Sequence, residues 1–262
     1  MKSVMFCVAD KKNEPYATAL RNSLRKFYTE EELPFVLYDQ EALDKIEDPQ
    51  KFYRATPYFA SKLFEQGYDL IIKADADQII TGKLDYMLDD KKHFDAGVVY
   101  NWNRVDPQKY GEIGFATISP IEYVNCGFVV MKSKEFVNHW MRLCYGKHFD
   151  RMPFREQGFL NTLVYYGNYS ILFLDNFDPI FNYSAWHGLL SKSEWNKIKL
   201  VGDELVLPQA GDGYPEMDKK IKVIHWAGGE EAQKMNYRLY FQEDVIKRLD
   251  YLNGFYIRQK SV

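Results

Sequence analysis

The feature that most constrains the fold is a short apolar run, Leu70–Ile72, followed closely by two aspartates, Asp75 and Asp77. The run has the length and the β-branched content of a buried strand. Residues two apart in an extended chain point to the same side, so the two carboxylates are expected to project together, with their Cα atoms about 7 Å apart. Carboxylates brought together repel each other unless a cation or a proton lies between them. The pattern therefore predicts a divalent-metal site that would in turn hold phosphates.

The tripeptide alone does not decide this, because paired acids also cap helices and occur in turns. The context favours the metal site. Ile79-Ile80 and a Thr81-Gly82 turn follow the acids, so the pair lies between two hydrophobic segments, which is unusual for a solvated turn.

The start of the chain predicts a β-α-β unit. Residues Ser3–Val8 read as a buried strand, and Pro15 opens a helix whose face carries Leu20, Leu24 and Phe27. A second short strand follows at Pro34–Tyr38. Consecutive parallel strands joined by a helix imply an α/β fold, with a mostly parallel sheet and helices on both faces.

The rest of the chain continues the alternation. Thr56 and Pro57 are expected to begin a helix that ends near Gly67, and Ser133 is expected to cap another through Leu143. The segment Trp102–Ile121 has little periodicity and is interpreted as an active-site loop. Further strands are expected at 96–100, 123–131, 171–174 and 223–226, and further helices at 84–88, 156–161 and 243–252.

Size, charge and cysteine content limit the class of protein. With 262 residues, 30.9 kDa and no linker-like stretch, we expect one domain over 1–262. A net charge of −3 argues against a nucleic-acid binder. No signal-like start and no run near the roughly 18 apolar residues of a membrane span is visible, so no transmembrane segment is expected. The three cysteines, Cys7, Cys126 and Cys144, fit reduced thiols and a cytoplasmic location.

Taken in order, several motifs resemble those of GT-A glycosyltransferases, most of all family 8, the group of glycogenin and bacterial galactosyltransferases. The resemblance runs over nearly the whole chain. It rests on the opening strand to Asp10, the Lys62-Leu63 helix, Asp75-Ala76-Asp77, Asn125-Cys126-Gly127, the segment from Glu156 to Asn161, and His225-Trp226-Ala227-Gly228.

The resemblance implies a site and a reaction. It implies that Asp75, Asp77 and His225 hold one cation, with Mn²⁺ preferred over Mg²⁺ because of the imidazole. The donor would be a nucleotide diphosphate sugar, expected to be a UDP-sugar, and the acceptor a carbohydrate or another hydroxyl compound, with retention at the anomeric carbon. The donor-binding residues would be Ala9, Asp10, Lys62, Asp75, Ala76, Asp77, Gly228 and Lys234, and those near the transferred sugar Asn125, Glu156 and Gln157.

Two departures from the family pattern affect these roles. The family places a lysine six residues after the histidine, where this chain has Glu231 and the nearest lysine is Lys234. Glu156 stands where the family has aspartate, which lengthens a side chain close to the expected sugar. Either a longer loop delivers Lys234 to the phosphates or that contact is lost.

Simpler roles stay open for single residues. Asp10 could be a turn or cap residue rather than a partner of a uracil N–H, Lys62 a solvated helix lysine, and His225 a core histidine. The other four histidines, His93, His139, His148 and His187, are interpreted as structural. Tyr183 and Trp186 are expected to line an acceptor groove or to pack in the core.

Two other functions compete with sugar transfer. Phosphohydrolases that form an aspartyl-phosphate also place Asp-x-Asp after a hydrophobic strand, but near the amino terminus and with a different fifth residue. A non-catalytic lectin or scaffold would keep the sheet without the chemistry, which the acid pair and His225 argue against.

Overall fold

A mixed six-stranded sheet forms the centre of the computed structural model, in the order β2-β1-β3-β8-β5-β9. Only β8 runs opposite to the other five strands, because its pairings with β3 and with β5 are both antiparallel. In sheet order the strands are β2 (Phe35–Tyr38), β1 (Ser3–Val8), β3 (Leu70–Ala74), β8 (Val124–Met131), β5 (Ala96–Tyr100) and β9 (Ile171–Phe173).

The structure describes residues 1–100, 112–113, 116–117, 123–152, 154–174, 183–184, 197–207, 219–225 and 241–253. The expected loop Trp102–Ile121 lies outside these residues, except for a two-stranded ribbon of β6 (Glu112–Ile113) and β7 (Ala116–Thr117). Trp186, His187, Gly228 and Lys234 also lie outside them.

Period-two alternation divides the central strands between two hydrophobic cores. On β1, Val4 and Phe6 belong to one core, whereas Met5 and Cys7 belong to the other. Because both faces are buried, the strands read as continuous apolar runs, as expected for a helix-covered sheet.

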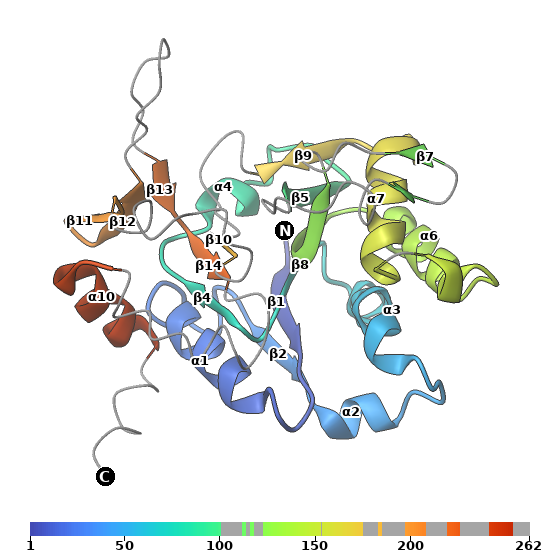
Figure 1. Ribbon diagram of the computed structural model, residues 1–262, viewed down its shortest axis with the longest axis horizontal. Coiled ribbons are helices and arrows are strands. Elements are labelled where there is room, and N and C mark those ends of the chain that lie inside the picture. The colour runs from blue at the N-terminus through green and yellow to red at the C-terminus, as the bar shows by residue number, and fades with distance from the viewer. Residues whose placement is uncertain are drawn as a thin grey trace.

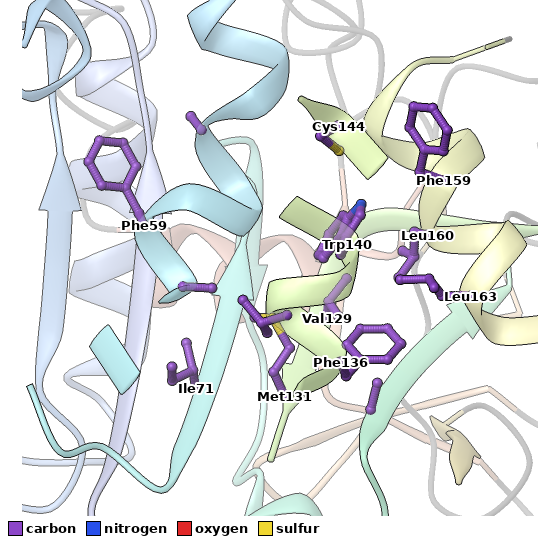
Figure 2. Packing of buried hydrophobic residues seen from close by; sticks show 14 of the residues in the cluster. Phe59, Ile71, Val129, Met131, Phe136, Trp140, Cys144, Phe159, Leu160 and Leu163 are labelled. Carbon is purple, nitrogen blue, oxygen red and sulfur yellow. The ribbon is translucent and has the colours of Figure 1, made fainter. Parts of the chain in front are cut away.

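Three helices cover the first face: α3 (Lys51–Glu65), α6 (Lys134–Cys144) and α7 (Glu156–Tyr166). Figure 2 shows side chains of these helices, among them Phe59, Trp140 and Leu160, which form one buried cluster with Ile71 of β3 and Val129 of β8. The short α2 (Gln40–Asp44) also packs on this face through Leu43. Ser133 caps α6 as predicted, since its hydroxyl accepts a hydrogen bond from the amide of Phe136 at 3.1 Å.

The second face is covered by α1 (Glu14–Leu24) and by the short α4 (Asp85–Leu88). Beside α1 lies a small sheet in the order β10-β14-β4, formed by β10 (Tyr183–Ser184), β14 (Val223–His225) and β4 (Gln78–Ile80). A further sheet and helix, β11 (Lys199–Val201), β12 (Glu204–Leu207), β13 (Lys219–Ile221) and α10 (Glu243–Asn253), share a third core with β4 and β14. Figure 1 shows α3, α6 and α7 on one side of the central sheet and α1 and α10 on the other.

The α/β class and the helices on both faces are confirmed, but the start of α3 was predicted wrongly. The helix begins at Lys51, so Thr56 is not its cap and Pro57 lies inside it. A proline inside a helix removes one backbone hydrogen bond and costs about 3 kcal/mol. Here the buried residues Ala55, Phe59 and Leu63, which pack against the sheet, outweigh that cost.

All three cysteines are unpaired, as predicted; Cys7 and Cys144 are buried and Cys126 is partly buried. Among the helices that the structure describes, none has the length and apolar character needed to cross a membrane.

Candidate metal centre

Strand pairing brings His225 to the two aspartates. The chain leaves β3 at Ala74, turns through Asp75-Ala76-Asp77 and enters β4 at Gln78. Strand β14 pairs antiparallel with β4 so that His225 lies opposite Gln78, the residue that follows Asp77. The acids therefore converge through a turn and not, as the sequence suggested, by alternation along an extended strand.

The three side chains have the geometry of a cation site. The Nε2 atom of His225 lies 3.1 Å from Oδ1 of Asp77 and 3.6 Å from Oδ2 of Asp75. One ligand atom from each residue fits within a span of 4.8 Å. An octahedral ion with ligands at about 2.1 Å places neighbouring ligand atoms about 3 Å apart. Two carboxylates and an imidazole therefore fit a divalent ion, and the imidazole favours a transition metal.

Gly127 of β8 allows this convergence. A Cβ atom at this position would lie 2.4 Å from Cε1 of His225, 2.6 Å from Oδ1 of Asn125 and 2.7 Å from Oδ2 of Asp75. The backbone carbonyl of Gly127 also accepts a hydrogen bond from the amide of Asp75 at 2.8 Å. Glycine in a strand marks the close approach of other groups, and two of the three groups here belong to the candidate metal ligands His225 and Asp75.

A buried lysine that sequence reasoning did not single out contacts the acid pair. Lys73 of β3 has a side chain that is 4% exposed, and its ammonium pairs with Oδ1 of Asp75. The same ammonium donates to the carbonyl oxygen of Cys126 at 2.8 Å. Burial alone would lower the pKa of Lys73, but the carboxylate of Asp75 raises it, so the lysine stays charged.

Asp77 is held in its ionised form by His225. Burial opposes ionisation of this carboxyl, yet the charge and hydrogen bond of His225 bring its pKa below the usual value. A metal binds a carboxylate and a neutral imidazole, so a cation at this pair would displace the proton of His225.

A cavity of about 240 Å³ adjoins the metal-site residues at the carboxyl ends of β1 and β3. Open α/β sheets bind their ligands at this edge. The described lining residues are Val8, Asn13, Phe52, Thr56, Lys73, Asp75, Ala76, Asp77, Cys126 and Glu156. Sequence reasoning placed four of them here, the Asp75–Asp77 turn and Glu156. A lysine inside an apolar strand, two residues before Asp75, was a signal that could have identified Lys73.

Asn125 and Gln157 lie beside the cavity and support the backbone of β8. The side chain of Asn125 accepts a hydrogen bond from the amide of Gly127 at 2.6 Å. Gln157 accepts one from the amide of Cys126 at 3.1 Å. These contacts fall where β8 shifts register against β5, between the pairs Val98 with Val129 and Val99 with Asn125.

Glu156, the first residue of α7, presents a buried carboxyl group to the cavity. Among the described residues, its Oε2 atom has no hydrogen-bond partner. Phe154 and Arg155, which precede it, have φ values of 56° and 50°, a region that non-glycine residues rarely occupy. The guanidinium of Arg155 lies 4.0 Å above the ring of Tyr53 on α3. Strained backbone held by such contacts is typical of functional sites.

Burial raises the pKa of Glu156 to about 8, which leads to a prediction about stability. In the folded protein the carboxyl stays protonated up to that pH, whereas in the unfolded chain it ionises near 4.5. The unfolded state then binds fewer protons between these values, so stability falls as pH rises through this window. Between pH 5 and pH 8, the free energy of unfolding of wild type should fall by as much as about 4 kcal/mol because of Glu156, and we expect Glu156→Gln to abolish this fall.

Urea unfolding of the metal-free protein at both pH values measures this effect. Glu135→Gln, which changes an exposed glutamate on α6, serves as the control, and its stability should depend on pH as that of wild type does. Parallel pH profiles for wild type and Glu156→Gln would contradict the assignment.

The remaining predicted site residues are placed differently. Ala9 is buried, and Asp10 accepts hydrogen bonds from the amide and side chain of Asn13 at 3.0 and 2.8 Å, as a turn residue does. Both lie between Val8 and Asn13, which line the cavity. Lys62 is not brought to the site: its ammonium pairs with Glu65 on the exposed side of α3. His139 has a structural contact, 3.0 Å from the hydroxyl of Tyr169.

Comparison with solved structures identifies the fold. The galactosyltransferase LgtC, solved in complex with donor and acceptor sugar analogues, aligns with a TM-score of 0.56 and 15% identity over 96% of this chain and 95% of its own. A glycosyltransferase involved in glycosylation of the major capsid of PBCV-1 aligns with a TM-score of 0.52 and 9% identity over 96% and 99%. The bifunctional enzyme WbbM aligns with a TM-score of 0.52 and 16% identity over 87% of this chain, which spans 46% of WbbM.

No protein-family model and no curated protein sequence matches the chain. The structural likenesses, together with the mixed sheet and its helices on both faces, show that this chain has the GT-A fold of glycosyltransferases.

Proposed function

We propose that the protein is a metal-dependent glycosyltransferase that moves a sugar from a nucleotide diphosphate sugar to a hydroxyl acceptor. One observation carries this proposal: Asp75, Asp77 and His225 converge beside a cavity at the carboxyl edge of a GT-A sheet. That the similar LgtC was solved with donor and acceptor sugar analogues supports binding of both kinds of ligand.

In this proposal the nucleotide lies at the end of β1, against Val8 and Asn13 and near Asp10. We propose uridine as the base, since the second carboxylate oxygen of Asp10 can accept from a ring N–H. Gly228 and Lys234, which lie outside the described residues, are proposed to contact the diphosphate.

The proposed cation is Mn²⁺, with Mg²⁺ as the alternative, held by Asp75, Asp77 and His225. When bound, it supplies Lewis-acid stabilisation of the negative charge that develops on the departing diphosphate. Asn125, Glu156 and Gln157 are proposed to lie near the transferred sugar. The protonated Glu156 can donate a hydrogen bond to a sugar hydroxyl. Retention of configuration at the anomeric carbon is proposed from the resemblance to family 8.

A thermal-shift panel of nucleotide sugars with and without Mn²⁺, followed by a turnover assay on each hit, tests the proposal. Stabilisation by a UDP-sugar that depends on Mn²⁺, followed by sugar transfer or slow donor hydrolysis, is the expected result. Release of phosphate from a simple phosphoester without any sugar nucleotide would instead identify a phosphohydrolase. Donor binding without turnover on any acceptor would indicate a non-catalytic binding protein.

Asp77→Asn is expected to reduce Mn²⁺ affinity and Mn²⁺-dependent donor binding at least about tenfold, because a neutral amide replaces an anionic ligand. Isothermal titration with Mn²⁺ alone and then with UDP measures both. The matched control is Asp203→Asn, whose carboxylate is 90% exposed and should affect neither. Unchanged donor binding and turnover in Asp77→Asn would show that the site is assigned wrongly.

A further inference from the structure

The buried ammonium of Lys73 is an unusual component for a site that must bind a cation. Lys73 lies on β3 opposite Phe6 of β1 and Val129 of β8, on the face that otherwise carries apolar side chains. A lysine is almost never fully buried unless it is paired. Its partner here is Asp75, one of the three proposed metal ligands.

The contacts of Lys73 fix its charge beside the acids without closing the site. Two of its three N–H donors serve Oδ1 of Asp75 and the carbonyl oxygen of Cys126. The other carboxylate oxygen, Oδ2 of Asp75, is the one that faces Nε2 of His225 at 3.6 Å. Asp75 can therefore bind a metal through one oxygen while the other stays on the lysine.

The presence of Lys73 changes the charge that a bound metal leaves behind. With the imidazole neutral, as metal binding requires, two carboxylates and one ammonium carry one net negative charge, so a divalent ion makes the site positive by one. Without the ammonium, the same ion would only neutralise the site. A positive site attracts the two negative charges of a diphosphate, whereas a neutral one does not.

We propose that Lys73 is a fixed positive charge with opposite effects on two binding steps. It weakens the binding of the metal ion alone, and it strengthens the binding of a diphosphate to the site that already holds the metal. It thereby couples metal binding to donor binding. This inference rests on the proposed function, whose metal and donor it shares. A lysine that only orients Asp75 would have a different signature, because its loss would weaken metal and diphosphate binding together.

Two titrations on the full chain test the proposal: Mn²⁺ alone, and UDP at saturating Mn²⁺. For Lys73→Met, we expect Mn²⁺ to bind roughly tenfold more tightly and UDP roughly tenfold more weakly than in wild type. Lys45→Met, which removes a lysine that is 72% exposed, should change neither affinity. A Lys73→Met protein that binds Mn²⁺ more weakly, or that binds both ligands as wild type does, overturns the proposal.

Two further variants keep the test decisive. Lys73→Arg keeps the charge and should keep the wild-type pair of affinities. Lys73→Gln removes the charge but keeps a hydrogen-bond donor for Cys126, so it replaces Lys73→Met should that variant not fold. Wild-type protein that binds neither Mn²⁺ nor UDP would overturn the proposed function itself, whereas wild-type binding with no opposite shift in the neutral variants overturns this inference alone.

Discussion

Gly127→Ala is expected to lower metal affinity by about 10- to 100-fold, the loss seen when groups that support metal ligands are changed. The added methyl would lie 2.4 Å from the imidazole of His225 and 2.7 Å from Oδ2 of Asp75. Real Cβ atoms essentially never make contacts this short, so the ligands or the strand must shift. Because the backbone of Gly127 is itself bonded to the amide of Asp75, the strand cannot shift without displacing the acid turn.

Mn²⁺ titration of Gly127→Ala measures this loss, and Gly97→Ala provides the control. Gly97 lies on β5 of the same sheet, and its Cβ would meet Leu174 at 3.2 Å and Val130 at 3.3 Å, away from the metal ligands. We expect Gly97→Ala to be destabilised by overpacking while it keeps wild-type metal affinity. Wild-type metal affinity in Gly127→Ala would show that His225 and Asp75 do not act as ligands together.

The local elements could be predicted because their signals lie within short windows. Strand β1 was predicted with its observed bounds, and the cap of α6 followed from Ser133 alone. A glycine inside the strand-like run 123–131 is a signal of the same kind, because glycine weakens a strand unless another group approaches it closely. Each of these inferences depends on alternation, capping or backbone freedom, which a sequence displays directly.

The parts that sequence reasoning missed depend on long-range contacts. No window of sequence contains the pairing of β14 with β4 that puts His225 opposite Gln78; the histidine was found only through resemblance to a family. Pro57 indicated a helix start under a local rule, and burial of α3 against the sheet overrode that rule. Lys62 was chosen for its place in a motif, whereas among the described residues it is Lys73, inside an apparently apolar strand, that lines the cavity.

Asn161, the last residue of the family-like segment that starts at Glu156, has a structural role. Asn161 of α7 is fully buried, and its side chain joins the helix to β8. Its oxygen accepts from the amide of Val124 at 2.8 Å, and its nitrogen donates to the carbonyl of Val124 at 2.9 Å and to that of Gln157 at 2.8 Å. This connection holds α7, and with it Glu156, against the strand that carries Gly127.

Asn161→Leu is therefore expected to destabilise the protein by about 3 to 5 kcal/mol, because it leaves buried backbone groups of Val124 without partners. Asn161→Asp distinguishes this mechanism from a loss of packing, since it keeps the shape but places a carboxylate oxygen against two carbonyl oxygens. Burial and those carbonyls should raise the pKa of the new carboxyl, so that protonation restores one donor. The loss of stability of Asn161→Asp, measured against wild type at the same pH, should therefore shrink as pH falls from 8 to about 5.

Urea unfolding of the Asn161 variants across this pH range measures both effects. Thr162→Ala, the control on the same helix, removes one hydrogen bond to the carbonyl of Gly158 and should cost no more than about 1 kcal/mol. If Asn161→Leu were as stable as Thr162→Ala, the contact with β8 would contribute little, and the register shift of β8 would have to be maintained by Gln157 and the bond between Gly127 and Asp75. Because Gly127 lies on the same strand, the connection through Asn161 also predicts that Asn161→Leu weakens metal binding without touching any ligand.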